Sequence, residues 1–272
     1  MSTGRVELNS STALVTGACS GIGLALARQL GGLGYRLLLV SHRAEPLAEA
    51  ARAIAADSGV EAIPVVLDLA RREAAAALAQ RVRALGIEID VLVNNAGMFF
   101  FGEAADADPE RAADLLELHV VTPSLLVTHF APGMRARGRG HILFVSSVSA
   151  FKDFPGISYY GASKKYLLGF ARAVRSELGP HGVCVSCLAP GPVDTALYDT
   201  NTVPVHLARR LGVMMSPERV AREALDALFR NQELCIPGAG VRALTQATQL
   251  LPQTLIDLLR VRAPWLRKRT VS

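Results

Sequence analysis

The chain of 272 residues is 50% hydrophobic and 19% charged, which suits one α/β domain with a substantial core. No run approaches the roughly 18 uninterrupted apolar residues that a membrane span needs, and the N-terminus lacks the layout of a secretion signal, so we expect a cytoplasmic protein with no transmembrane segment. The net charge of +5 equals the five basic residues within 258–272, which contain no acid, and such localised charge disfavours a nucleic-acid-binding domain.

Runs rich in Val, Ile and Leu alternate with helical stretches rich in Ala, Arg and Leu along the chain. Strands are predicted at Thr12–Thr16, Arg36–Ser41, Glu61–Leu67, Asp90–Val93, His141–Ser146, Val183–Leu188 and Glu233–Ile236. Helices are predicted at 21–33, 44–57, 71–85, 109–136, 157–179 and 217–230. Nearly continuous apolar strands are typical of strands buried on both faces. The pattern predicts a single Rossmann-like doubly wound domain, with about seven parallel strands and helices on both faces.

A glycine-rich turn, TGACSGIG, joins the first predicted strand to the first predicted helix. Glycines at such a turn let the backbone bend sharply and approach a pyrophosphate, which lies at the positive end of the following helix. The position after a strand and before a helix favours a dinucleotide site over an ordinary turn. The residues expected to contact the cofactor here are Gly17, Cys19, Ser20, Gly21, Ile22 and Gly23.

The end of the second predicted strand carries Ser41, His42 and Arg43 and no carboxylate. NAD sites usually place an acid here for the ribose 2′-hydroxyl, whereas an arginine accommodates a 2′-phosphate. A carboxylate would repel the phosphate, while the planar guanidinium of Arg43 can bind it. We therefore expect NADP(H), the alternative being that Arg43 is only a solvated cation at a helix start.

Tyr160 and Lys164 are four residues apart on the predicted helix 157–179 and so share one of its faces. A phenol is a poor base at neutral pH, and a nearby ammonium lowers its pKa towards a useful range. Ser147, at the end of the fifth predicted strand, lies where open α/β sheets bind ligands and can hydrogen-bond a substrate oxygen. The three residues suit proton transfer to or from a carbonyl or alcohol.

Six motifs occur in the order found in short-chain dehydrogenases and together span residues 12–195. They are TGACSGIG, Asp68-Leu69, Asn94-Asn95-Ala96-Gly97, Ser147, Tyr160-Gly-Ala-Ser-Lys164 and Pro190-Gly191-Pro192-Val193-Asp194-Thr195. The chain thus resembles the short-chain dehydrogenase/reductase family, with its TGxxxGxG, NNAG, YxxxK and PG pattern.

The resemblance assigns further contacts with the cofactor. It implies that Asp68 and Leu69 flank the adenine. Beside the nicotinamide ribose it places Asn95, Ala96 and Gly97, together with Tyr160 and Lys164, and on the carboxamide it places Pro190, Gly191, Val193 and Thr195. It also implies a homodimer or homotetramer formed through the helices predicted at 109–136 and 157–179.

One departure from the family pattern concerns the helix predicted at 109–136. The family commonly has an asparagine there that anchors a water linking the lysine to solvent, and this chain has His119. Histidine can hydrogen-bond a water and titrates near neutrality, so His119 is a candidate member of the catalytic group. The alternative is that His119 is only packed in an unkinked helix.

The segment 190–216 resembles the variable lid that closes over substrate in this family. Its Tyr198, together with Phe99 and Phe154 near strand ends, is a candidate substrate contact, and these aromatics suggest an apolar ketone or alcohol. The Cys184 and Cys187 pair has CxxC spacing but no second such pair, so we expect buried thiols and no metal site.

The residues 238–272 fall outside the alternation and form a leucine-rich, basic C-terminal extension to a dehydrogenase domain at 1–237. They resemble the extension of a subgroup that includes acyl-chain and steroid reductases. The segment could form a membrane-surface helix, or a helix packed on the domain or a partner subunit. We favour packing, because Asp257 and two prolines interrupt a clean amphipathic face.

The residues and the resemblance together predict an NADP(H)-dependent oxidoreductase that moves a hydride between nicotinamide and a ketone or secondary alcohol. A dinucleotide-binding sensor without turnover stays open because of His119. An epimerase-type enzyme without net redox change is disfavoured by the spacing of Gly17, Gly21 and Gly23.

Overall fold

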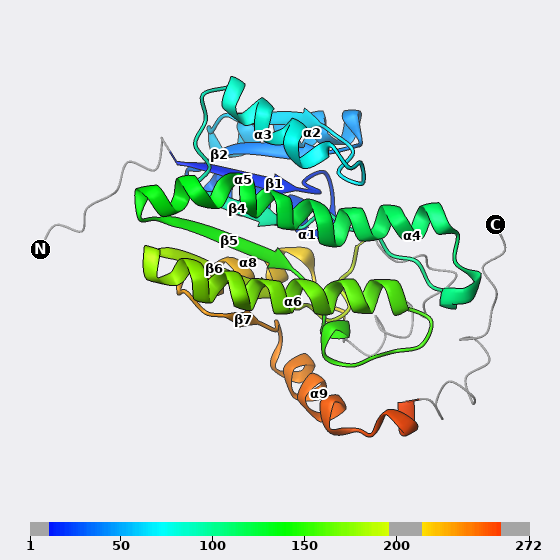
Figure 1. Ribbon diagram of the computed structural model, residues 1–272. Coiled ribbons are helices and arrows are strands. Elements are labelled where there is room, and N and C mark those ends of the chain that lie inside the picture. Colours follow the sequence, from blue (N-terminus) through cyan, green and yellow to red (C-terminus); the bar gives the residue numbers. More distant parts are fainter. Residues whose placement is uncertain (1–10, 196–213, 257–272) are drawn as a thin grey trace, which may run out of the picture.

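A computed structural model describes residues 11–195 and 214–256 of the chain (Figure 1). Within these ranges, seven parallel strands form one sheet in the order β3-β2-β1-β4-β5-β6-β7. The strands are β1 (Thr12–Thr16), β2 (Arg36–Ser41), β3 (Ala62–Val66), β4 (Val91–Asn94), β5 (Gly140–Val145), β6 (Val183–Leu188) and β7 (Leu234–Cys235). The order confirms the predicted doubly wound parallel sheet. Tyr198 and most of the predicted lid lie outside the described residues.

Helices cover both faces of the sheet and enclose two apolar cores. One face carries α1 (Gly21–Gly32), α2 (Ala44–Ser58) and α8 (Pro217–Phe229). The other carries α3 (Ala74–Ala84), α5 (Thr122–Arg137) and α6 (Ser158–Leu178). Alternate strand residues serve the two cores, because side chains along a strand point to opposite faces. Leu14 belongs to one core and Val15 to the other, and both are fully buried.

The predicted helix 109–136 is helical throughout, but it contains a π turn and is therefore not one regular α-helix. The structure has α4 (Pro109–Leu116), a π-helical turn η3 (Glu117–Val121), and then α5. The Thr122 N–H donates to the carbonyl of Glu117, five residues earlier. Pro123 has no N–H, so the carbonyl of His119 cannot receive the usual bond from four residues ahead. A π turn commonly marks a functional position, and His119 lies within this one.

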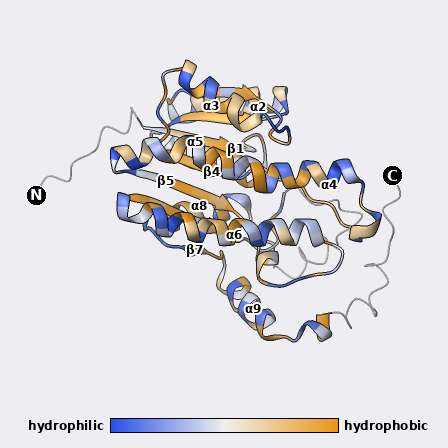
Figure 2. Ribbon diagram, in the orientation of Figure 1, coloured by the Kyte–Doolittle hydropathy of each residue, from blue (hydrophilic) through white to orange (hydrophobic). Residues whose placement is uncertain are grey.

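Because the seven strands are parallel, their carboxyl ends lie at the same edge of the sheet. The strand order reverses between β1 and β4, so the loops that follow these two strands diverge and leave a crevice there. Figure 2 shows the apolar strands in the middle of the molecule and polar residues on the outer sides of the helices. The predicted ligand-binding edge is therefore the one formed by the loops after β1, β2, β4 and β5.

The C-terminal part described by the structure leaves the sheet after β7. Helix α9 (Ala239–Leu250) lies beyond that edge of the sheet, below α6 in the view of Figure 1. The helical extension predicted from the sequence is present over these residues. Among the helices described, none combines the length and the apolar character needed to cross a membrane.

Candidate functional site

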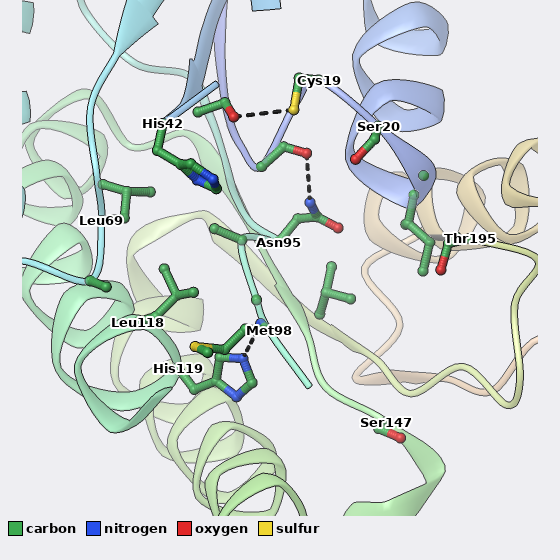
Figure 3. A pocket seen from close by; sticks show the side chains of 18 of the residues that line it. Cys19, Ser20, His42, Leu69, Asn95, Met98, Leu118, His119, Ser147 and Thr195 are labelled. Atoms are coloured by element: carbon green, nitrogen blue, oxygen red, sulfur yellow. Dashed lines mark hydrogen bonds between the residues drawn. The ribbon is translucent and has the colours of Figure 1, made fainter. Parts of the chain in front are cut away.

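A cavity of about 500 Å³ opens at the carboxyl ends of the strands, at the point where the strand order reverses (Figure 3). The segments that line it are the glycine-rich turn, the ends of β2 to β5, the region of α4 and η3, the N-terminal part of α6, and the loop after β6. The cofactor contacts expected from the sequence that line it are Gly17, Cys19, Ser20, Gly21, Ile22, Ser41, His42, Arg43, Asp68, Leu69, Asn95, Ala96, Gly97, Tyr160, Lys164, Pro190, Gly191, Val193 and Thr195. Ser147 and His119 line it as well.

Gly23 is the one expected cofactor contact that does not line the cavity. A side chain at Gly23 would collide with the carbonyl oxygen of Gly17 and the amide nitrogen of Asn95. Its role is to let α1 pack closely under the turn. Gly17 has φ +66°, a left-handed conformation that favours glycine, and a Cβ there would lie 2.8 Å from the Asn95 side chain.

The start of α1 is suited to an anion. Ser20 occupies the N-cap without a side-chain capping bond, and the first turn contains no acidic residue. The positive end of the helix and its first N–H groups therefore meet the cavity wall formed by Ser20, Gly21 and Ile22. A pyrophosphate fits such a helix end, and the missing side chains at Gly17 and Gly21 leave its backbone open to approach.

Asn95 braces the glycine-rich turn from the neighbouring strand. Its side-chain Nδ2 donates to the carbonyl oxygens of Thr16, at 2.8 Å, and Gly17, at 3.3 Å. The backbone N–H groups of Asn95 and Ala96 both donate to Thr16 Oγ1, at 2.9 and 3.0 Å. The conformation of the turn thus depends on a loop almost 80 residues further along the chain.

The end of β2 presents a hydroxyl and a cation to the cavity. Ser41 is buried, its Oγ lies 3.1 Å from Cys19 Sγ, and it accepts a hydrogen bond from the Arg43 N–H at 3.3 Å. Arg43 occupies the N-cap of α2 with its side chain exposed. The carboxylate of Asp68 is 3.0 Å from the guanidinium of Arg71. Asp114, the other acid that lines the cavity, lies 3.5 Å from the same guanidinium, so both acids have a cationic partner in Arg71.

The opposite wall carries Tyr160, Lys164 and Ser147. The Lys164 ammonium donates to the Val145 carbonyl at 3.0 Å and lies 5.5 Å from the centre of the Tyr160 ring. Burial lowers the pKa of Lys164 to about 8, a shift that the neighbouring Cys187 thiol opposes. Ser147 follows β5, and its Oγ accepts a hydrogen bond from the Ser149 N–H at 3.2 Å, so its own hydroxyl proton is available for the cavity.

The comparison with known proteins agrees with this geometry. The sequence pattern of the family described as short chain dehydrogenase matches residues 11–203. This chain belongs to the short-chain dehydrogenase/reductase family. Its members are oxidoreductases, and an uncharacterized oxidoreductase from Myxococcus xanthus (strain DK1622) is 32% identical over 256 residues, covering 92% of this chain and 96% of the relative.

Two solved structures show how far the similarity extends. A short-chain dehydrogenase from Sphingobium yanoikuyae, in complex with NADPH, has a TM-score of 0.79 and 30% identity, covering 91% of this chain and 95% of that one. The bulky-bulky ketone specific alcohol dehydrogenase from Comamonas testosteroni has a TM-score of 0.75 and 25% identity, covering 97% of each chain. The similarity therefore includes the C-terminal part of this short-chain dehydrogenase as well as its sheet.

His119 is held on both sides of its ring. The Met98 N–H donates to Nε2 at 2.9 Å, as Figure 3 shows, and Nδ1 lies 2.9 Å from Ser163 Oγ. Ser163 Oγ in turn donates to the Tyr160 carbonyl at 2.8 Å. Burial, and secondarily the charge of Lys164, lowers the His119 pKa well below its usual value. The neutral ring accepts at Nε2, so it carries its proton on Nδ1.

The candidate substrate aromatics differ in position. The Phe99 ring meets Tyr160 edge-on, with 5.0 Å between centroids. Phe154 is 38% exposed, and neither Phe99 nor Phe154 is among the described residues that line the cavity. The ring of Phe100 packs against the ring of Tyr159, the residue before Tyr160, with 5.9 Å between centroids.

Three polar contacts near Tyr160 were not expected from the sequence. Ser146, which precedes Ser147 in the chain, donates to the Lys164 carbonyl at 2.7 Å and lines the cavity. Ser163 and the Met98 backbone hold His119. The adjacent hydroxyls at 146 and 147 were the one signal in the sequence for the first of these contacts. Met98 and Ser163 lie 21 and 44 positions from His119, and contacts over such separations leave no local pattern.

Proposed function

We propose that this short-chain dehydrogenase is an NADP(H)-dependent carbonyl reductase or alcohol dehydrogenase acting on a fairly apolar ketone or secondary alcohol. The observation that carries the proposal is the buried Lys164 ammonium beside the Tyr160 ring in a cavity that Ser147 also lines. A bound nicotinamide nucleotide supplies the hydride for reduction, or accepts it in the reverse direction. The residues of the chain supply the proton and hold the substrate oxygen.

In reduction, the Tyr160 hydroxyl donates its proton to the carbonyl oxygen. The resulting phenolate is stabilised by the Lys164 ammonium, which Val145 and the short link from Ser146 hold in place. Ser147 donates a hydrogen bond to the same substrate oxygen, since the bond that it accepts from the Ser149 N–H does not use its hydroxyl proton. In oxidation, Tyr160 as phenolate removes the alcohol proton.

We assign His119 to positioning. Its neutral ring ties the segment after β4, through Met98, to the helix that carries Tyr160 and Lys164, through Ser163. Both ring nitrogens have protein partners, which supports a structural link in place of the water-binding role considered from the sequence. A charged ring is disfavoured because His119 is 1% exposed and faces Lys164.

The choice of NADP(H) over NAD(H) rests on the end of β2. Ser41 carries no charge that would repel a 2′-phosphate, and Arg43 lines the cavity with its guanidinium exposed. The pairing of Asp68 with Arg71 reduces the remaining negative charge on that side. The NADPH complex of the Sphingobium yanoikuyae relative supports the same choice.

The substrate class is inferred from the aromatic surroundings of Tyr160. Phe99 packs on the tyrosine ring, and Met98 and Leu118 add apolar lining to the cavity. The bulky-bulky ketone specific relative from Comamonas testosteroni supports a bulky carbonyl compound. Charged sugar phosphates would lose hydration at such an apolar wall.

We propose the assembly to be a homodimer or homotetramer formed through the outer faces of α4, α5 and α6. Large apolar side chains on these helices, and on the η3 turn between α4 and α5, are exposed in the single chain. They are Leu116, Val121, Leu125 and Tyr166. The Ser124 hydroxyl lies 3.0 Å from the Tyr166 hydroxyl, so the exposed sides of α5 and α6 adjoin, and apolar side chains exposed on adjoining helices are typical of a protein interface. Light scattering on the purified chain would test this.

The test of the activity is NADPH oxidation with a panel of aryl and long-chain ketones, followed at 340 nm. We expect turnover with bulky ketones, and Tyr160→Phe to lower kcat by about 10²- to 10⁴-fold while leaving NADPH binding within a factor of about two. The Tyr159→Phe variant is the matched control and should keep its activity. Tight NADPH binding with no turnover across the panel, in either direction, would contradict the proposal and favour a dinucleotide sensor.

A further inference from the structure

Asn94 carries a buried amide at the end of β4. The residue is 5% exposed, and neither Oδ1 nor Nδ2 of its side chain has a hydrogen-bond partner among the described residues. Leu92, two residues earlier and on the same face of the strand, belongs to the apolar core beneath α3, α5 and α6. An amide buried among apolar side chains without hydrogen bonds is strongly unfavourable, so this amide calls for a ligand that supplies them.

A small cavity lies beside this amide. Residues of β4, η3, α5 and α6 line it, and its volume of about 10 Å³ is room for about one water molecule. The Thr16 hydroxyl at its wall donates to the Val93 carbonyl. The Thr122 hydroxyl donates to the Leu69 carbonyl, so both hydroxyl protons are already used. No carboxylate or thiol is among the described residues that line the cavity, which disfavours a metal ion.

The π turn η3 contains a backbone carbonyl that neither helical pattern supplies with a donor. In an α-helix the carbonyl of Leu118 would accept from the N–H of Thr122, but that N–H donates to the carbonyl of Glu117. In a π-helix it would accept from residue 123, which is a proline and has no N–H. Leu118 lines the small cavity, while Figure 3 shows its side chain at the larger one. An amide without partners and a residue whose carbonyl lacks a helical donor therefore line the same cavity.

We propose that this cavity binds one water molecule, which accepts a hydrogen bond from Asn94 Nδ2 and donates one to the Leu118 carbonyl. A buried water typically makes about three hydrogen bonds, and its second proton serves Asn94 Oδ1 on the same edge of the amide. The bound water ties the end of β4 to the π turn. Asn94 is thereby a positioning residue for His119, which lies in that turn.

The position of η3 matters to the reaction through His119. Its ring reaches the Met98 N–H and Ser163 Oγ at the same time, each at 2.9 Å, so it spans from the segment after β4 to α6. A shift of η3 would lengthen one of these bonds and move Tyr160 relative to the opposite side of the site, and small displacements of reacting groups lower turnover. The effect on turnover rests on the proposed function, whereas the water site itself does not.

A high-resolution crystal structure of the full chain tests the water site directly. We expect one water peak within about 3.2 Å of both Asn94 Nδ2 and the Leu118 carbonyl oxygen. The peak should be missing in Asn94→Leu, because leucine has a similar size and no polar atom to hold the water. Leu92→Met is the matched control, since it changes a fully buried side chain on the same face of β4 without removing a polar group, and it should keep the water.

Turnover tests the positioning role. Asn94→Leu should lower kcat about tenfold and leave the Kd for NADPH within a factor of about two, because Asn94 is not among the described residues that line the large cavity. Asn94→Ser keeps a hydroxyl that can hold the water and should stay within about threefold of the wild-type kcat. Pro123→Ala supplies an N–H that can serve the Leu118 carbonyl without water. In that background Asn94→Leu should lower kcat less than about threefold, as a double-mutant cycle would measure.

Three results would overturn the proposal. The first is a wild-type structure without a water in the cavity, or with the Asn94 amide bonded directly to a protein carbonyl. The second is a water that remains in Asn94→Leu, which would show that Asn94 does not hold it. The third is a kcat that Asn94→Leu leaves unchanged, or lowers equally with and without Pro123→Ala, which would remove the positioning role. A wild type that turns over no ketone would overturn the proposed function, and the crystal structure would still decide on the water site.

Discussion

The two walls of the cavity are built in different ways. The wall formed by the glycine-rich turn and the start of α1 uses backbone groups, and its shape depends on side chains that are missing at Gly17 and Gly23. The wall formed by η3 and α6 uses buried polar side chains, namely His119, Ser163 and Lys164. Substitutions should therefore disturb the first wall by steric clash. They should disturb the second wall by the loss of hydrogen bonds or by a change of protonation state.

Lys164→Met gives the largest expected effect and tests the second wall. The loss of the ammonium beside Tyr160 should lower kcat by about 10²- to 10⁴-fold, measured as NADPH oxidation. Methionine fills the buried space without charge, so the variant should be at least as stable as the wild type at pH 7 in urea unfolding. An active variant would show that Tyr160 does not depend on this ammonium.

The same variant allows the pH dependence of stability to be checked. The Lys164 pKa is lowered from 10.5 to about 8 in the folded protein, so between these values the unfolded chain binds the proton and the folded chain does not. Stability from this group therefore rises with pH between about 8 and 10.5 and is lost as pH falls to 8. The unfolding free energy of the wild type relative to Lys164→Met should rise by about 3 kcal/mol over this range. A difference in unfolding free energy that does not change with pH would mean that the Lys164 ammonium is hydrated in the folded protein.

Gly23→Ala tests the first wall. The added methyl would collide with the Gly17 carbonyl and the Asn95 amide, so the turn must shift and NADPH should bind about 10- to 100-fold more weakly. Gly32→Ala, at the other end of α1, is the matched control, because its Cβ would meet open space. Fluorescence titration with NADPH measures both. Equal affinities in the two variants would show that the turn adapts without loss.

His119→Phe tests whether the ring links the two sides of the site. The Met98 N–H and Ser163 lose their partner, so kcat should fall about tenfold while NADPH affinity stays within a factor of about two. In the wild type, nitrogen-15 NMR should show the proton on Nδ1 and no titration of His119 in the range where a free histidine titrates. A ring that titrates in this range, with a matching step in the pH profile of kcat, would restore the proton-relay hypothesis.

Arg43→Gln has the smallest expected effect and tests the choice of nucleotide at the first wall. The KM for NADPH should rise about tenfold, while the KM for NADH should stay nearly unchanged, because only the former carries the 2′-phosphate. Arg52→Gln, further along the same helix, is the control. A parallel rise for both nucleotides would indicate a general loss of positive charge and not a phosphate contact.

The local motifs predicted the first wall well. A glycine turn between a strand and a helix acts through neighbouring residues, so the sequence TGACSGIG identified it without tertiary information. The parallel direction of the strands also followed from the alternation of strands and helices, whereas the order of the strands came from the structure. The π turn within the helix at 109–136 could not be predicted in the same way, because Pro123 is compatible with a kink and also with an ordinary helix start.

The sequence by itself determined the family, the parallel sheet and the identity of Tyr160, Lys164 and Ser147 as neighbours in one site, since each follows from a local pattern or from strand order. Only the tertiary structure decided that His119 bonds Met98 and Ser163, and that Leu244 faces outward while Thr245 faces the domain. The physical reason is the same in both cases. Helical periodicity shows which residues share a face, but contacts between distant segments decide what that face meets.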